Sequence, residues 1–294
     1  MIQCLLTGGS SQIGYFLLPE LLAADSTVQV LAWARQARPD HLAAHERLCW
    51  HIAGKTTNDV PQVAHITEII SLGPLHLTLD AMPHCARLQR VVAVTSSSIL
   101  IKQDSTDAFE REQIRALAAA EQSLINRCQQ RGVICQVLRP TLIYGAGLDA
   151  NVCALERLAD RFGVIPVADR AAGLRQPVHA ADIADAILRL REFNRSGCWT
   201  VTGGSTLSYR QLAESVCQAL QRGRVIGVPP LLLRALLSAA HVGGRLRGIN
   251  AAMIQRQNQD LLFADQAART DFGWAAREFQ LTPAMLRAPQ QPWQ

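Results

Sequence analysis

Short apolar runs, bounded by turn residues, alternate with longer stretches of helical period over the first half of the chain. The apolar runs predict strands at residues 2–6, 28–34, 68–72, 90–95 and 135–139, and the helical stretches predict helices at 13–24, around 74–84, and at 109–131. This alternation is typical of parallel strands joined by crossover helices. We therefore expect an α/β fold with a doubly wound parallel sheet.

The pattern becomes less regular after residue 145. It predicts helices at 152–161 and 182–191, a strand at 198–202, and a further helix that begins at Ser208. We expect residues 1–145 to form the main domain and residues 146–294 to form a smaller C-terminal substrate-binding lobe. Segments around 176–202 are expected to return to the main domain.

The apolar segment 225–242 is a candidate for membrane contact. It contains two prolines, an arginine and a histidine, which make it a poor bilayer span. We expect a helix that packs over a substrate cleft. An amphipathic helix lying on a membrane surface through residues 231–237 would have a similar pattern and is the alternative.

Composition narrows the class of protein. The 294 residues are 49% hydrophobic and 18% charged, which indicates a folded chain that needs no metal or disulfide for stability. The net charge of +5 comes from scattered arginines and only two lysines, so no nucleic-acid partner is expected. The eight cysteines lack C-x-x-C spacing, and a strand begins directly at the N-terminus. We expect reduced cysteines, no signal peptide and a cytoplasmic location.

The sequence LLTGGSSQIG at residues 5–14 follows the first predicted strand and opens the first helix. Gly8 permits a tight turn, and backbone N–H groups at the helix N-terminus can hold a pyrophosphate. Gly14 lets the helix pack closely on the sheet, while Ser11 stands where a G-x-x-G-x-x-G loop has its middle glycine. The loop predicts a Rossmann-type dinucleotide site. A Ser/Gly-rich turn without a ligand is the alternative.

The end of the second predicted strand bears on the choice of cofactor. Folds that prefer NAD usually place an acidic residue there, against the ribose hydroxyls. This chain has Arg35, with Arg38 close behind. A guanidinium at this place would pair with a 2′-phosphate, so we expect NADP, with NAD as the alternative. An ordinary surface arginine would look the same.

Taken together, these segments resemble the extended short-chain dehydrogenase/reductase superfamily, in its NAD-dependent epimerase/dehydratase family. The resemblance spans nearly the whole chain and rests on TGGSSQIG at 7–14, VVAVTSSS at 91–98, LRPTLIYG at 138–145, PVHAADIA at 177–184 and DFGW at 271–274. It implies that Arg139, Pro140 and Thr141 end a strand beside the nicotinamide. It also implies that the segment around His179 closes one side of the substrate cleft. His179 as a hydrogen-bonded loop residue, and Tyr144 as a core residue, are the alternatives.

The resemblance and the glycine-rich loop together define a set of candidate cofactor-binding residues. These are Gly8, Ser10, Ser11, Gln12, Ile13, Gly14, Arg35, Ser96 and Pro140.

The catalytic residues of that family are only partly present. The resemblance implies a Ser or Thr that holds the substrate oxygen, a Tyr that moves the proton, and a Lys four residues later that lowers the pKa of the Tyr. Ser98 matches the first, as a catalyst or as a remaining hydrogen-bonding residue. Gln113 and Leu117 stand where the Tyr and Lys should be, and none of the three tyrosines has a lysine four residues on.

Any proton transfer therefore needs another group. The candidates are Glu110, Glu112, His179 or a water molecule. No metal site is expected.

Two functions remain open from the sequence. The first is an atypical NADP-dependent oxidoreductase or epimerase that acts on a nucleotide-sugar or small polar substrate in the cleft between the lobes. The second is a non-catalytic NADP-binding sensor or assembly protein. The enzyme should have an ionisable group in its pocket, whereas the sensor should have that space filled by apolar side chains such as Leu117. A monomer and a homodimer are equally consistent with the sequence.

Overall fold

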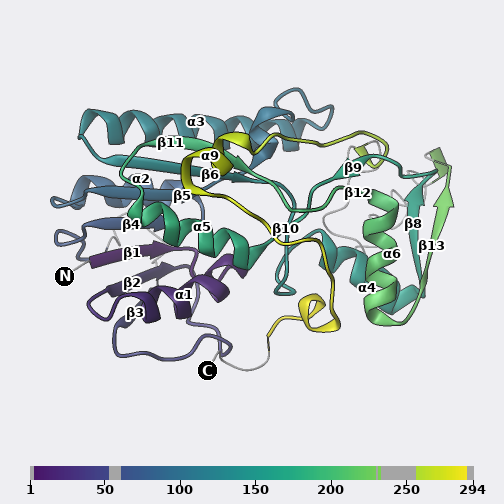
Figure 1. Cartoon of the computed structure of the whole chain (residues 1–294), viewed down its shortest axis with the longest axis horizontal. Helices are drawn as coiled ribbons and strands as arrows, with labels where there is room; N and C mark the ends of the chain where they lie inside the picture. Colours follow the sequence, from purple (N-terminus) through teal and green to yellow (C-terminus); the bar gives the residue numbers. More distant parts are fainter. Residues whose placement is uncertain (1–2, 53–60, 230, 233–255, 290–294) are drawn as a thin grey trace.

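The computed structural model describes residues 3–52, 61–229, 231–232 and 256–289. Its centre is a seven-stranded sheet in the order β11-β6-β5-β4-β1-β2-β3, with parallel pairing throughout (Figure 1). The expected doubly wound α/β fold is confirmed. The strands of the sheet are β1 (Gln3–Thr7), β2 (Gln29–Ala34), β3 (Leu48–Ile52), β4 (Glu68–Ser71), β5 (Arg90–Val94), β6 (Ile134–Pro140) and β11 (Gly197–Val201).

Helices cover both faces of this sheet. On one face, α1 (Gln12–Ala24), α5 (Ala180–Glu192) and α9 (Gln266–Phe272) share one hydrophobic cluster with the strands. On the other face, α2 (Leu75–Ala81), followed by the 3₁₀ turn η1 (Met82–His84), and α3 (Ala108–Gln130) share a second cluster. Because both faces of the central strands are buried, the strands read as continuous apolar runs in the sequence.

A smaller group of elements lies beyond one end of the sheet, at the right of Figure 1. It contains α4 (Val152–Phe162), α6 (Tyr209–Leu220) and the parallel pair β8 (Val164–Ala168) and β13 (Arg224–Val228). This group has its own hydrophobic core. Two short pairs connect it to the sheet: β7 (Ile143–Tyr144) with β10 (Val178–His179), and β9 (Leu174–Arg175) with β12 (Leu207–Ser208). The strand β11 returns to the main sheet beside β6.

Two local expectations differ from the structure. The strand β3 was not anticipated, because it is a half-exposed edge strand without a continuous apolar run. The predicted helix at 225–242 is wrong at its start, because residues 224–228 form β13, which pairs with β8. The rest of that segment lies mostly outside the described residues, as does most of the proposed membrane contact at 231–237. Within the described residues, no helix combines the length and the apolar character needed to cross a bilayer.

Candidate functional site

The turn between β1 and α1 has a geometry that only glycine allows at two positions. Gly8 has a φ of +72°, and a Cβ on it would lie 2.4 Å from the backbone nitrogen of Gly73. A Cβ on Gly14 would lie 2.1 Å from the carbonyl oxygen of Gly9. The first glycine therefore makes the turn, and the other brings α1 against it.

Ser11 caps α1 within this turn. Its backbone N–H donates to the carbonyl of Gly8 at 2.9 Å, and its hydroxyl oxygen accepts from the N–H of Gly14 at 3.2 Å. The next two N–H groups, those of Gln12 and Ile13, have no acceptor among the described residues. The Ile13 side chain is buried in the core, so this residue offers a ligand only its backbone. Free N–H groups at a helix N-terminus fit a pyrophosphate.

A cavity of about 640 Å³ opens beside this turn, at the carboxyl ends of the central strands. Gln12 contributes to its wall from the turn, Ser96 and Ser98 from the loop after β5, and Thr141 from the loop after β6. The tertiary structure thus brings three of the residues predicted from the sequence, Gln12, Ser96 and Ser98, to one cavity. Pro140 ends β6 directly before Thr141.

Of the predicted cofactor residues, only Gln12 and Ser96 are in the described lining of this cavity, and two of the others are exposed. Ser10 is exposed on the turn. Arg35 follows β2, is exposed, and makes no ion pair with any residue that the structure describes. Its side chain is therefore open to an anionic partner.

A lysine that the sequence analysis did not single out lies in the cavity wall. The 3₁₀ turn η2 (Ser97–Leu100) leads into Lys102, whose backbone N–H donates to the carbonyl of Ser98 at 2.9 Å. This i to i+4 bond places Ser98 and Lys102 one turn apart, and both line the cavity. The Ser98 hydroxyl has no hydrogen-bond partner among the described residues. The signal in the sequence was a serine followed four residues later by one of only two lysines.

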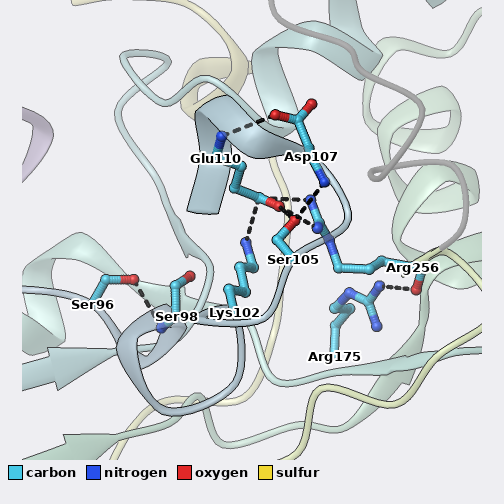
Figure 2. A network of polar contacts seen from close by, with 8 residues as sticks. All are labelled: Ser96, Ser98, Lys102, Ser105, Asp107, Glu110, Arg175 and Arg256. Atoms are coloured by element: carbon cyan, nitrogen blue, oxygen red, sulfur yellow. Dashed lines mark hydrogen bonds and ion pairs between the residues drawn. The ribbon is translucent and has the colours of Figure 1, made fainter. Parts of the chain in front are cut away.

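Figure 2 shows the polar network around this lysine. The Lys102 Nζ lies 3.5 Å from the Glu110 Oε1 in the first turn of α3. The Glu110 carboxylate also accepts from the Ser105 hydroxyl at 2.6 Å and from both terminal nitrogens of Arg256 at 2.5 and 2.8 Å. Two cations therefore share one carboxylate.

Burial and neighbouring charge change the acidity of these groups. Burial lowers the pKa of Lys102, the positive charge of Arg256 lowers it further, and Glu110 offsets part of that shift. Burial acts to raise the pKa of Glu110, but the hydrogen bonds from Ser105 and Arg256 and the charge of Lys102 outweigh it, so the pKa is lowered. The cavity wall thus holds an ionised carboxylate beside an amine that releases its proton more readily than an exposed lysine does.

The other candidate acids do not lie in this wall. Glu112 is exposed on α3, as is Gln113 at the position of the family's tyrosine. Leu117 packs against the core between α3 and the sheet. Neither Gln113 nor Leu117 is among the described residues that line the cavity, so Leu117 does not fill this space.

His179 has a structural role in the described chain. Its Nδ1 accepts from the N–H of Ala181 at 3.1 Å and so caps α5, and its ring packs between Phe16 and Tyr144. It is 3% exposed, and burial lowers its pKa to about 4. His179 is not among the described residues that line the cavity, whereas Gln176 of the same segment is. A role of this segment in closing the cleft stays a prediction. Tyr144 is a core residue.

The buried neutral state of His179 predicts a pH dependence of stability. The folded-state pKa of about 4 lies below the unfolded value near 6.5, so the unfolded chain takes up the proton first as the pH falls. The stabilisation is complete above about pH 6.5 and is lost toward pH 4. Between pH 7 and 4.5 we expect a loss of about 2.5 kcal/mol that is absent in His179→Asn, which keeps a capping acceptor.

Urea unfolding at the two pH values measures this difference. The exposed His65 supplies the matched control, His65→Asn, which should keep the full loss. An unchanged pH dependence in His179→Asn would show that another group causes it.

Comparison with solved structures identifies the fold. An epimerase from Methanothermobacter thermautotrophicus superposes with a TM-score of 0.72 at 12% identity, over 97% of this chain and 89% of that one. The dTDP-glucose 4,6-dehydratase of Bacillus anthracis, solved with NAD, gives 0.68 at 13% identity, over 97% and 94%. The UDP-glucose 4-epimerase of Thermus thermophilus, also solved with NAD, gives 0.61 at 16% identity, over 87% and 97%. No family model matches the sequence, and no curated protein matches it either.

Proposed function

We propose that this chain, which has the fold of the extended short-chain dehydrogenase/reductase enzymes, is an NADP-dependent oxidoreductase or isomerase of atypical type. In this proposal Ser98 and Lys102 do the work of the missing Tyr and Lys. The observation that carries it is the turn that places both residues in the cavity that begins at Gln12 of the glycine turn. The solved epimerases and dehydratase with this fold support a nicotinamide dinucleotide as the cofactor.

The residues around the turn fit such a cofactor. Gly8 makes the tight turn and Gly14 brings α1 against it, and among the described residues the N–H groups of Gln12 and Ile13 have no acceptor and can bind a pyrophosphate. Ser10 and Ser11 would add hydroxyl groups, and Ser96 and Pro140 would border the nicotinamide end. When bound, the nicotinamide supplies the hydride donor or acceptor.

The side chains in the cavity can manage the accompanying proton. The Ser98 hydroxyl, free of protein partners in the described chain, would orient the substrate oxygen by a hydrogen bond. The Lys102 ammonium would give a proton to that oxygen during reduction, and the neutral amine would take it during oxidation. Glu110 holds the Lys102 side chain in place, while Arg256 keeps Glu110 ionised.

A non-catalytic NADP-binding sensor or assembly protein is the second candidate. It is favoured by Gln113 and Leu117 at the positions of the family's Tyr and Lys. The two functions differ in whether the Lys102 network is needed. A sensor would bind the dinucleotide, and replacing Lys102 would change no turnover rate.

The cofactor preference is tested at Arg35. We expect Arg35→Ala to weaken NADPH binding about 5- to 150-fold, because a charge-assisted contact to the 2′-phosphate is lost, and to change NADH binding less than about twofold. Titration calorimetry with each dinucleotide measures both affinities. Arg87→Ala is the matched control, because Arg87 is also exposed but precedes its strand β5, whereas Arg35 follows β2 at the carboxyl ends of the parallel strands.

Two contrary outcomes of this titration would contradict different parts of the proposal. Equal losses for NADPH and NADH would show that Arg35 does not bind a 2′-phosphate. Binding of neither dinucleotide to the unmodified protein would contradict the proposed function itself.

A further inference from the structure

Apolar side chains form much of the cavity wall that comes from the smaller lobe. The helix α4 turns one side toward the cavity, and α6, β8 and the segment after residue 260 complete the surface. The apolar side chains of this wall are Leu148, Ala154, Leu155, Leu158, Pro166, Leu212, Leu261 and Phe263. A surface of this kind gains free energy by covering an apolar ligand.

The Arg175 side chain of the same wall is already hydrogen-bonded to the protein. The Arg175 guanidinium donates to the carbonyls of Leu174 at 2.7 Å, Gln259 at 2.7 Å and Arg256 at 2.6 Å. It also lies over the ring of Tyr209, 5.8 Å from the ring centre. Few donor positions remain on Arg175 for a ligand.

The smaller polar groups of the wall are also bonded internally. The Asp149 carboxylate accepts from the N–H groups of Asn151 and Val152 at 2.9 and 2.6 Å, at the start of α4. The side-chain oxygen of Gln176 accepts from the N–H of Phe263 at 2.8 Å. These bonds use the side-chain oxygens of Asp149 and Gln176 to hold the lobe together, and they bring no positive charge to its wall.

This distribution disfavours a substrate with a diphosphate in the lobe. A diphosphate is bound by free guanidinium or ammonium groups, or by free backbone N–H groups. Of the two arginines in the described lining, Arg175 binds carbonyls and Arg256 binds Glu110. The remaining cation, Lys102, lies in the loop after β5 that also carries Ser98, where it shares the Glu110 carboxylate with Arg256 (Figure 2).

We propose that the substrate is a carbonyl compound, or the matching alcohol, with one reactive oxygen and an extended apolar body. The oxygen lies at Ser98 and Lys102, and the apolar body lies against α4 and α6. This substrate class rests on the proposed oxidoreductase function. In the reduction, the carbonyl carbon receives a hydride from NADPH, which becomes NADP⁺, and the oxygen receives a proton from the Lys102 Nζ to give the alcohol.

A homologous series of 2-alkanones, from 2-butanone to 2-decanone, tests the apolar wall. We expect kcat/KM for NADPH oxidation to rise about two- to fourfold for each added methylene, until the cavity is filled. Binding is measured separately with the matching 2-alkanols, which cannot react with NADPH. In the presence of saturating NADPH, their dissociation constants should fall with chain length by the same factor.

A variant in the wall separates this effect from general hydrophobic binding. Ala154 is half-buried on the cavity side of α4, so Ala154→Asp places a carboxylate on the wall without removing a core side chain. We expect it to weaken 2-nonanol binding at least about tenfold and to leave 2-butanol and NADPH binding unchanged. Arg157→Asp puts the same carboxylate on the exposed side of α4 and should leave the series unchanged.

The outcomes distinguish the substrate class from the function. NADPH binding with no dependence on alkanol chain length, together with stabilisation by UDP-glucose, would overturn the apolar class in favour of a nucleotide-sugar and leave the oxidoreductase standing. Failure of NADPH to bind would overturn the oxidoreductase and the substrate class together. If the dissociation constants of the alkanols fall with chain length as steeply in Ala154→Asp as in the unmodified protein, the apolar body binds elsewhere.

Discussion

Replacing Lys102 with methionine is expected to lower kcat for the NADPH-dependent reduction of 2-nonanone by a factor of about 10²–10⁴, the usual contribution of a positioned proton donor. The methionine side chain is close in length and apolar, so it removes the proton but keeps most of the packing. Glu110 retains its hydrogen bonds from Ser105 and Arg256 in this variant. NADPH affinity should change far less than kcat, because the free N–H groups of the glycine turn are untouched.

The variant Lys102→Arg separates proton transfer from positive charge. Arginine keeps the charge beside Glu110 but does not release its proton in the accessible pH range. We expect Lys102→Arg to be nearly as slow as Lys102→Met. An active Lys102→Arg would show that the residue contributes charge alone, and an active Lys102→Met would remove it from the mechanism.

A spectroscopic measurement tests the same residue without any substrate. Because the chain has only two lysines, reductive ¹³C-methylation gives two side-chain NMR signals and one from the N-terminus. The signal lost in Lys102→Met should titrate below the ordinary lysine pKa of 10.5, because burial and Arg256 disfavour the charged form. Glu110→Gln should lower that pKa further, since Glu110 acts to raise it. Reduction needs the protonated amine, so the rate should fall as the pH rises through this lowered pKa.

The largest effect on stability is expected at Arg139. Glu121 of α3 is 3% exposed and accepts from the Arg139 Nε at 3.1 Å and from the Thr95 hydroxyl at 2.7 Å. Arg139→Met would leave this carboxylate buried without its cation, at a cost of about 3–5 kcal/mol in the free energy of unfolding. Urea unfolding at neutral pH measures the loss.

The double variant Arg139→Met with Glu121→Leu supplies the control. It removes both charges together and keeps side chains of similar size, so we expect it to recover most of the stability that the single variant loses. If the double variant is as unstable as Arg139→Met alone, the loss comes from packing and not from the unpaired carboxylate. The Arg139 side chain binds Glu121 of α3, and the place of this strand end beside a nicotinamide stays a prediction.

The central sheet and the glycine turn were predictable from the sequence because both obey local rules. Strands buried on both faces give continuous apolar runs, and five of them were placed within about two residues of their bounds. Gly8 and Gly14 occupy backbone positions where a Cβ would clash, so the spacing of these two glycines predicts the turn from the sequence. By contrast, β3 and β13 have weaker patterns, since part of each strand faces solvent.

The chemistry of the cavity was decided by tertiary structure. Glu110 and Arg256 are 146 residues apart, and only the return of the chain past the smaller lobe joins them beside Lys102. His179 had the residue type of an acid catalyst, but its packing between Phe16 and Tyr144 makes it a buried cap. The sequence by itself determined the parallel sheet and the glycine turn, because backbone conformation and apolar periodicity are local properties. Which ionisable groups face the cavity depends on contacts between distant segments, and only the folded chain sets those contacts.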